Sequence, residues 1–204
     1  TVPGVGITIS PTTASVAING TKTFTATVTG SSNSAKTWSC SAGSITSGGV
    51  FTAPATAGTC TVTATCAADP TKTATATVTV SPVVTVTADV ATVDQGATDA
   101  FYATVDGLAD QAVTWTTSAG TITSGGVLTA PNAAGTVTVT ATSVADPTAK
   151  ATKAVTVRAV AITVTPKTVS VPSGTTQSFN ATVTGTVNGG VTWTVVSGGG
   201  SLGN

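Results

Sequence analysis

The chain has 204 residues with seven Lys or Arg and seven acidic side chains, so its formal net charge is zero. Only 7% of the residues are charged, and so few scattered cations exclude a basic patch for nucleic acid or an anionic membrane surface. His and Glu are absent, which excludes His-dependent triads, His metal sites and Glu acid–base pairs, so we expect no enzymatic activity and no cofactor.

Apolar and polar residues alternate with period two along most of the chain, as they do in residues 24–28 (FTATV) and 62–65 (VTAT). This alternation is the pattern of a half-buried strand, and the β-branched Val and Thr suit a pleated surface. The sequence therefore predicts an all-β fold. In the first 81 residues the predicted strands cover residues 5–10, 14–18, 21–29, 35–41, 44–46, 50–53, 59–66 and 72–80.

Turn residues separate these strands. Asn19-Gly20 is a dipeptide of tight turns, and Ser47-Gly48-Gly49 fits a short hairpin loop. About seven short antiparallel strands with such turns between them are typical of a small Greek-key sandwich.

An internal repeat organises the chain. Trp38, Trp115 and Trp193 follow one another at intervals of 77 and 78 residues, and the residues around the first two are nearly identical. Such a period predicts three small domains at residues 1–81, 82–158 and 159–204, each with its Trp in the core. The third domain is partial, because the chain lacks its later strands. Either the sequence was cut there, or another chain completes the domain.

Several segments together resemble one known family. They are residues 7–29 (ITISPTTASVAINGTKTFTATVT), the Trp of the third strand, GVFTAP, GTCTVTAT and the closing ATATVTV. These segments are similar to bacterial immunoglobulin-like domains of the group 2 type. The resemblance covers residues 5–157, with 159–204 as a partial copy. It implies tandem immunoglobulin-like Greek-key β-sandwiches, and it brings no catalytic residue with it.

The three cysteines all lie in the first repeat. Strand parity places Cys40 on the same face as Trp38, and Cys60 on the inward face of a later strand. If these strands are antiparallel neighbours, a Cys40–Cys60 disulfide is predicted, and closing a loop of about 20 residues would stabilise the domain by about 3 kcal/mol. The alternatives are a Cys40–Cys66 disulfide and free thiols.

Acidic residues cluster at the start of the second repeat, where Asp89, Asp94 and Asp99 are candidate calcium ligands because calcium prefers carboxylate oxygens. The alternative is that they are solvated carboxylates at strand edges and turns. Asn19 (N-G-T) and Asn180 (N-A-T) lie in glycan acceptor sequences. O-linked sugar on outward Thr rows is the other modification considered, and Thr also simply suits exposed strand positions.

The chain begins at Thr1 and contains no Met, so we expect a processed or excised piece of a longer product. It has no uninterrupted apolar run of about 18 residues, so no membrane-spanning helix is predicted. Heavy use of Thr, Ser, Ala and Gly is typical of secreted and cell-surface proteins, and the cysteines are compatible with an oxidising compartment. We therefore expect an extracellular or cell-surface location.

The leading functional hypothesis is a non-enzymatic stalk or subunit of a bacterial surface fibre or filament. Its partners would be copies of itself or neighbouring domains of a longer chain. The incomplete third domain would expose unpaired strand edges that a strand from another chain can complete. The alternatives are a carbohydrate-binding or host-adhesive module, which would bind glycans or a host surface, or accessory domains of a secreted enzyme or of a phage tail or capsid protein.

Overall fold

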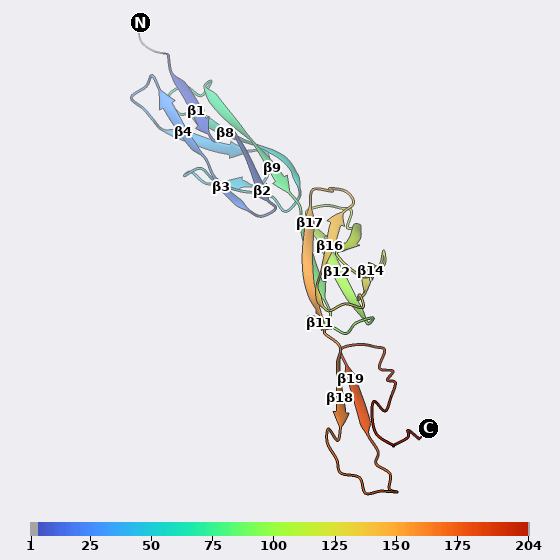
Figure 1. The fold of residues 1–204 in the computed structure, drawn as a ribbon. Coiled ribbons are helices and arrows are strands. Elements are labelled where there is room, and N and C mark those ends of the chain that lie inside the picture. The colour runs from blue at the N-terminus through green and yellow to red at the C-terminus, as the bar shows by residue number, and fades with distance from the viewer. Residues whose placement is uncertain (1–3, 204) are drawn as a thin grey trace. The chain divides into compact units, whose positions relative to one another are not determined.

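The computed structural model describes residues 4–203, and it confirms the predicted all-β fold (Figure 1). In this part of the chain, no helix is long and apolar enough to cross a membrane. Every sheet takes its strands from a single repeat. Among the described residues, those up to residue 85 together with 103–114 and 141–151 form one compact unit, and the other described residues form a second one. This grouping does not follow the repeats, so the predicted domain boundaries stay predictions.

The first repeat is an immunoglobulin-like sandwich of nine strands. One sheet has the order β2-β9-β8-β5, and it faces the pair β1-β4 and the three strands β3-β7-β6. The order is of the Greek-key kind, because β1 pairs with β4 and β2 lies parallel to β9. The strands are β1 Gly6–Ser10, β2 Thr13–Ala17, β3 Thr21–Thr23, β4 Thr25–Thr29, β5 Lys36–Cys40, β6 Ser44–Ile45, β7 Val50–Thr52, β8 Gly58–Cys66 and β9 Thr73–Ser81.

Period-two alternation explains how these strands make a core. On β8 the side chains of Cys60, Val62, Ala64 and Cys66 are buried, while the Thr residues between them point outward. The predicted strand at residues 21–29 is interrupted at Phe24, whose N–H donates to Gly49 O at 2.8 Å. The chain passes there from pairing with β7 to pairing with β1.

The second repeat has the same plan. Its sheets have the orders β11-β17-β16-β13 and β10-β12-β15-β14, and β11 is again parallel to β17. The Trp115 ring packs edge-on against Phe101 with ring centroids 6.5 Å apart. The strands are β10 Val83–Ala88, β11 Thr92–Val93, β12 Thr98–Asp106, β13 Val113–Thr117, β14 Thr121–Ile122, β15 Val127–Thr129, β16 Gly135–Ser143 and β17 Lys150–Val157.

The third repeat contains one antiparallel pair, β18 (Ala161–Thr165) with β19 (Asn180–Thr184). Its pairing register is the same as that of β1 with β4 in the first repeat. In the described residues that follow β19, up to residue 203, there is no further strand, and only an isolated bridge joins Thr186 to Gln95. Within residues 159–203, the third repeat therefore shows one strand pair of a sandwich and no sheet that covers it.

Candidate interaction site in the third repeat

The third repeat exposes apolar side chains that the complete repeats bury. Phe24 and Phe101 occupy matching positions and are 0% and 1% exposed, whereas the third copy of this residue, Phe179, is 45% exposed. Trp38 and Trp115 pack against the cores of their repeats as predicted, but Trp193 is 42% exposed. The expectation of a core position for Trp193 is therefore corrected, because the described chain provides no second sheet to cover it.

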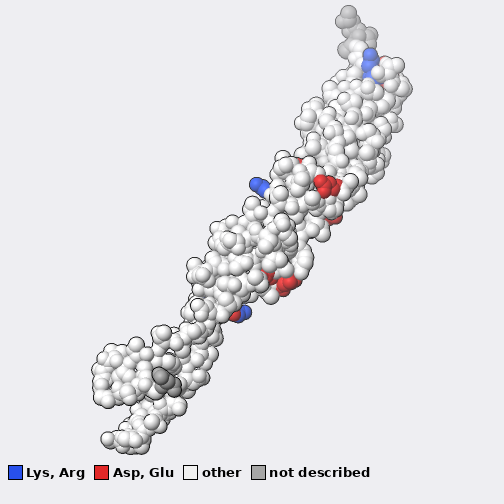
Figure 2. Space-filling view, turned by 90° about the vertical axis from the view of Figure 1, so that its right-hand side faces the viewer, with Lys and Arg blue, Asp and Glu red and all other residues white. Residues whose placement is uncertain are grey.

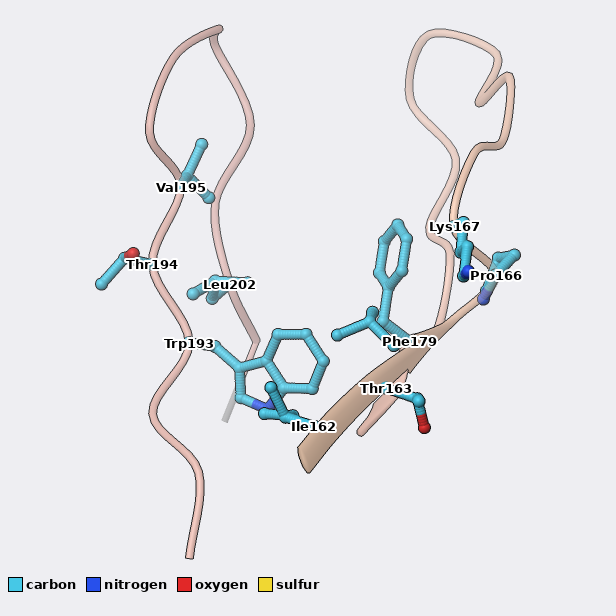
Figure 3. Close-up of a pocket in the computed structure, with 10 residues that line it drawn as sticks. Ile162, Thr163, Pro166, Lys167, Phe179, Trp193, Thr194, Val195 and Leu202 are labelled. Atoms are coloured by element: carbon cyan, nitrogen blue, oxygen red, sulfur yellow. The ribbon is translucent and has the colours of Figure 1, made fainter. Parts of the chain in front are cut away.

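These side chains line an open apolar cavity of about 540 Å³. Figure 3 shows the indole of Trp193 reaching toward the side of the cavity formed by β18 and Phe179. Lys167 is the one charged residue in the lining, so the cavity can hold apolar groups but offers no acid–base pair for catalysis. The lining residues are Ile162, Thr163, Val164, Pro166, Lys167, Phe179, Trp193, Thr194, Val195 and Leu202.

The first repeat shows what normally surrounds this Trp. Trp38 on β5 stands directly across from Ala64 on β8. On its other side the ring lies over Gly49, where an added Cβ would be 3.0 Å from Trp38 Cζ2. Gly126 lies against Trp115 in the same way, with a Cβ position 3.1 Å from Trp115 Cε2. Each complete repeat therefore holds its indole against a glycine backbone.

The cysteines are all free thiols, which corrects the predicted Cys40–Cys60 disulfide. The register places Cys40 opposite Val62, so Cys60 is the diagonal neighbour and not the direct partner. The Cys40–Cys66 alternative fails too, because Cys66 stands opposite Lys36, four residues along β5 from Cys40. Burial raises the pKa of the Cys40 thiol, and the nearby Cys60 thiol raises it further.

The three candidate calcium ligands make different contacts. Asp94 Oδ1 forms an ion pair with Arg158 Nη1 at 2.9 Å, and Asp89 Oδ2 accepts a hydrogen bond from the Tyr102 hydroxyl at 3.4 Å. Asp99 is buried on β12. Over residues 4–203, no group of three or more His, Cys, Asp or Glu side chains is placed to hold a metal ion.

The burial of Asp99 was not predicted from the sequence. It is 4% exposed, and neither carboxylate oxygen has a hydrogen-bond partner. Burial raises the pKa of Asp99 and the charge of Asp89 adds to the rise; the N–H groups of Val90, Ala100 and Asp89 lower it without reaching hydrogen-bond geometry. Its inward direction was readable from parity, because Asp99 is two residues before the core residue Phe101 on the same strand.

Both glycan acceptor residues are exposed. Asn19 lies in the turn between β2 and β3 with a φ of 58°, in the left-handed region that Asn tolerates. Asn180 is the first residue of β19, opposite Thr165. The geometry leaves both side chains accessible.

No known protein family matches the sequence, and no curated protein is significantly similar to it. The fold search finds the Yersinia pseudotuberculosis adhesin InvE, 15% identical with a TM-score of 0.31, covering 74% of this chain and 58% of that one. It also finds FdeC, an Escherichia coli adhesin, 19% identical with a TM-score of 0.32, covering 88% of this chain and 72% of that one. The chain spans less than two thirds of the InvE structure. At such low TM-scores, function has to be argued from the site itself.

Proposed function

We propose that this chain is a non-enzymatic, extracellular structural module, a stalk or subunit of a surface fibre, whose third repeat binds a β-strand from another polypeptide. The observation that carries the proposal is the contrast between the buried Phe24 and Phe101 and the exposed Phe179 and Trp193. In the described residues, a Phe and a Trp fourteen positions apart lie in a closed core in the first two repeats and in an open cavity in the third.

The surface supports a structural role. Figure 2 shows charged side chains lying singly or in small groups on the visible face, between wide uncharged areas. Outward positions on the strands are mostly Thr, which suits exposed sheet surface and provides no nucleophile without a neighbouring base.

Strand addition would satisfy two needs of the third repeat together. A bound strand would pair with the unpaired backbone around Trp193, as β8 pairs with β5 in the first repeat. It would also cover Trp193, Phe179 and Leu202, and full burial of one such side chain contributes about 1.5 to 3 kcal/mol. Main-chain hydrogen bonds and apolar burial are the two contributions that β-augmentation combines.

The oligomeric state of the chain tests this proposal. Sedimentation velocity over a range of concentrations should show association, and Trp193→Ser should abolish it. Val144→Ser is the control, because Val144 is 50% exposed against 42% for Trp193 but lies outside the cavity. The proposal is refuted if the wild-type chain stays monomeric at high concentration and the fluorescence of Trp193 remains that of a solvent-exposed indole. The same result is required in the presence of added peptides that could supply a strand.

A further inference from the structure

We propose that Asn188 is a site of spontaneous deamidation in the folded chain, and that Asn19 is protected although it stands in the same Asn-Gly sequence. In this reaction the backbone nitrogen after the Asn bonds to the side-chain Cγ, and the amide nitrogen leaves as ammonia with the proton of that backbone N–H. Water then opens the cyclic imide to aspartate or isoaspartate. Glycine favours the attack because it has no side chain in the way and its backbone turns freely. By sequence the two sites are equally reactive, so the fold decides between them.

The peptide that follows Asn19 is held on both sides. Gly20 N–H donates to Ala17 O at 2.9 Å, and Gly20 O accepts from Ala53 N–H at 2.9 Å. For the reaction, the Gly20 nitrogen has to lose its proton and turn toward the Asn19 side chain, so its hydrogen bond to Ala17 must break. The loss of one such bond corresponds to a slowing of up to about tenfold, and the second bond adds to it. The tight turn therefore protects Asn19.

Asn188 lies in the exposed segment after β19, and its side chain is turned over the peptide that would attack it. Asn188 Oδ1 accepts a hydrogen bond from Gly190 N–H at 3.4 Å, which holds Cγ along the Gly189 peptide and polarises its carbonyl group. Within residues 4–203, Gly189 N–H donates no hydrogen bond, and a Cβ added at Gly189 would meet no atom within 4 Å. The attacking nitrogen is therefore free and the electrophile is in place.

The complete repeats have the same exposed turn, so it does not depend on what covers the cavity of the third repeat. Asn33 and Asp110 occupy the positions that match Asn188, and both are exposed. Asn33 Oδ1 accepts from Ala35 N–H at 3.0 Å, and Asp110 Oδ1 accepts from Ala112 N–H at 2.9 Å. Asp110 also shows that an aspartate, one of the two products, fits this turn.

Peptide mapping by mass spectrometry, after the full chain is incubated at neutral pH, tests the proposal. Asn188 should convert at least about tenfold faster than Asn19 in the folded chain, whereas both should convert at similar rates in urea. Asn33 is the internal control, because it has the same turn but is followed by Ser34. Anion exchange should separate the product, since aspartate adds one negative charge to a chain of zero net charge.

Gly189→Val is the variant that tests the mechanism. Gly189 has space around it and a φ outside the left-handed region, so the variant should keep the melting curve of the wild type while Asn188 converts more slowly.

Three outcomes would overturn the proposal. Equal conversion of Asn19 and Asn188 in the folded chain would mean that the tight turn gives no protection. Conversion of both in urea but of neither in the folded chain would mean that the loop holds Asn188 in an unreactive geometry. If Gly189→Val folds like the wild type and converts as fast, the backbone nitrogen is not the attacking group.

Discussion

Removing the charge of Asp99 should stabilise the second repeat, and Asp99→Asn is the variant that does so with the least change of shape. Asp99 is enclosed beside Phe101, and its two oxygens lack hydrogen-bond partners. Burial raises the pKa of this carboxyl in the folded state, because the charged form is poorly solvated there. At any pH where the carboxyl is ionised in the unfolded chain, its ionisation therefore opposes folding.

The direction with pH follows from the raised pKa. Below the unfolded pKa of about 3.9 the carboxyl is protonated in both states and contributes no penalty. As the pH rises through the higher folded pKa, the wild-type repeat loses stability relative to Asp99→Asn. An unsatisfied buried polar group costs about 1 to 3 kcal/mol, and the amide keeps part of that cost, so a gain of about 1 kcal/mol at neutral pH is expected.

Calorimetry from about pH 3 to pH 7 measures this effect, since 1 kcal/mol shifts the melting temperature of a domain of this size by about 4 to 8 °C. The variant should melt higher than wild type at neutral pH, and the difference should shrink toward pH 3. Asp106→Asn is the control, because Asp106 is on the same strand but exposed. A difference that is absent at neutral pH, or that grows on acidification, would refute the reasoning.

Three further predictions concern packing and the thiols. Phe101→Ala should destabilise the second repeat by about 3 to 5 kcal/mol, whereas Phe179→Ala should change the urea denaturation of the chain much less, since Phe179 is half exposed. Gly126→Ala should destabilise the second repeat by at least about 1 kcal/mol in the same assay. The reason is that φ at this position is 83° and the added methyl group would lie 2.5 Å from Phe101 O. A variant as stable as the wild type would contradict this geometry. Iodoacetamide should modify Cys40 in the native protein before the other two cysteines, which are buried, and intact mass without reductant should show three alkylatable thiols after unfolding. A mass two hydrogens lower would instead reveal a disulfide.

Much of the fold was readable from the sequence because alternation reports directly on which residues face the core. The predicted strand at residues 59–66 is β8 at Gly58–Cys66, and the Asn19-Gly20 turn joins β2 to β3. Parity also placed Cys40 and Cys60 on inward faces. It did not place them opposite each other, because a shift of pairing by two residues leaves every side chain on the same face. Parity thus predicts faces, and register needs the paired backbone.

The site was only partly readable for a related reason. A tryptophan that recurs at a fixed interval predicts a core position, and this held for Trp38 and Trp115. It failed for Trp193 because burial depends on strands distant in sequence, which no local pattern around Trp193 describes. In the described residues no second sheet covers Phe179 either, so the same lack of long-range contacts accounts for the exposure of both side chains in the cavity.

The parallel pairing of β2 with β9 has a mechanical consequence. The two strands run side by side from Thr13↔Thr77 to Ala17↔Ser81, one near the entry of the chain into the first repeat and the other at its exit. A pull on the two ends of the repeat therefore slides β2 against β9 and loads their hydrogen bonds together in shear, instead of opening them one after another. In the second repeat the corresponding pairing of β11 with β17 covers only Thr92↔Thr156 and Val93↔Val157. Under tension, the second repeat should yield before the first.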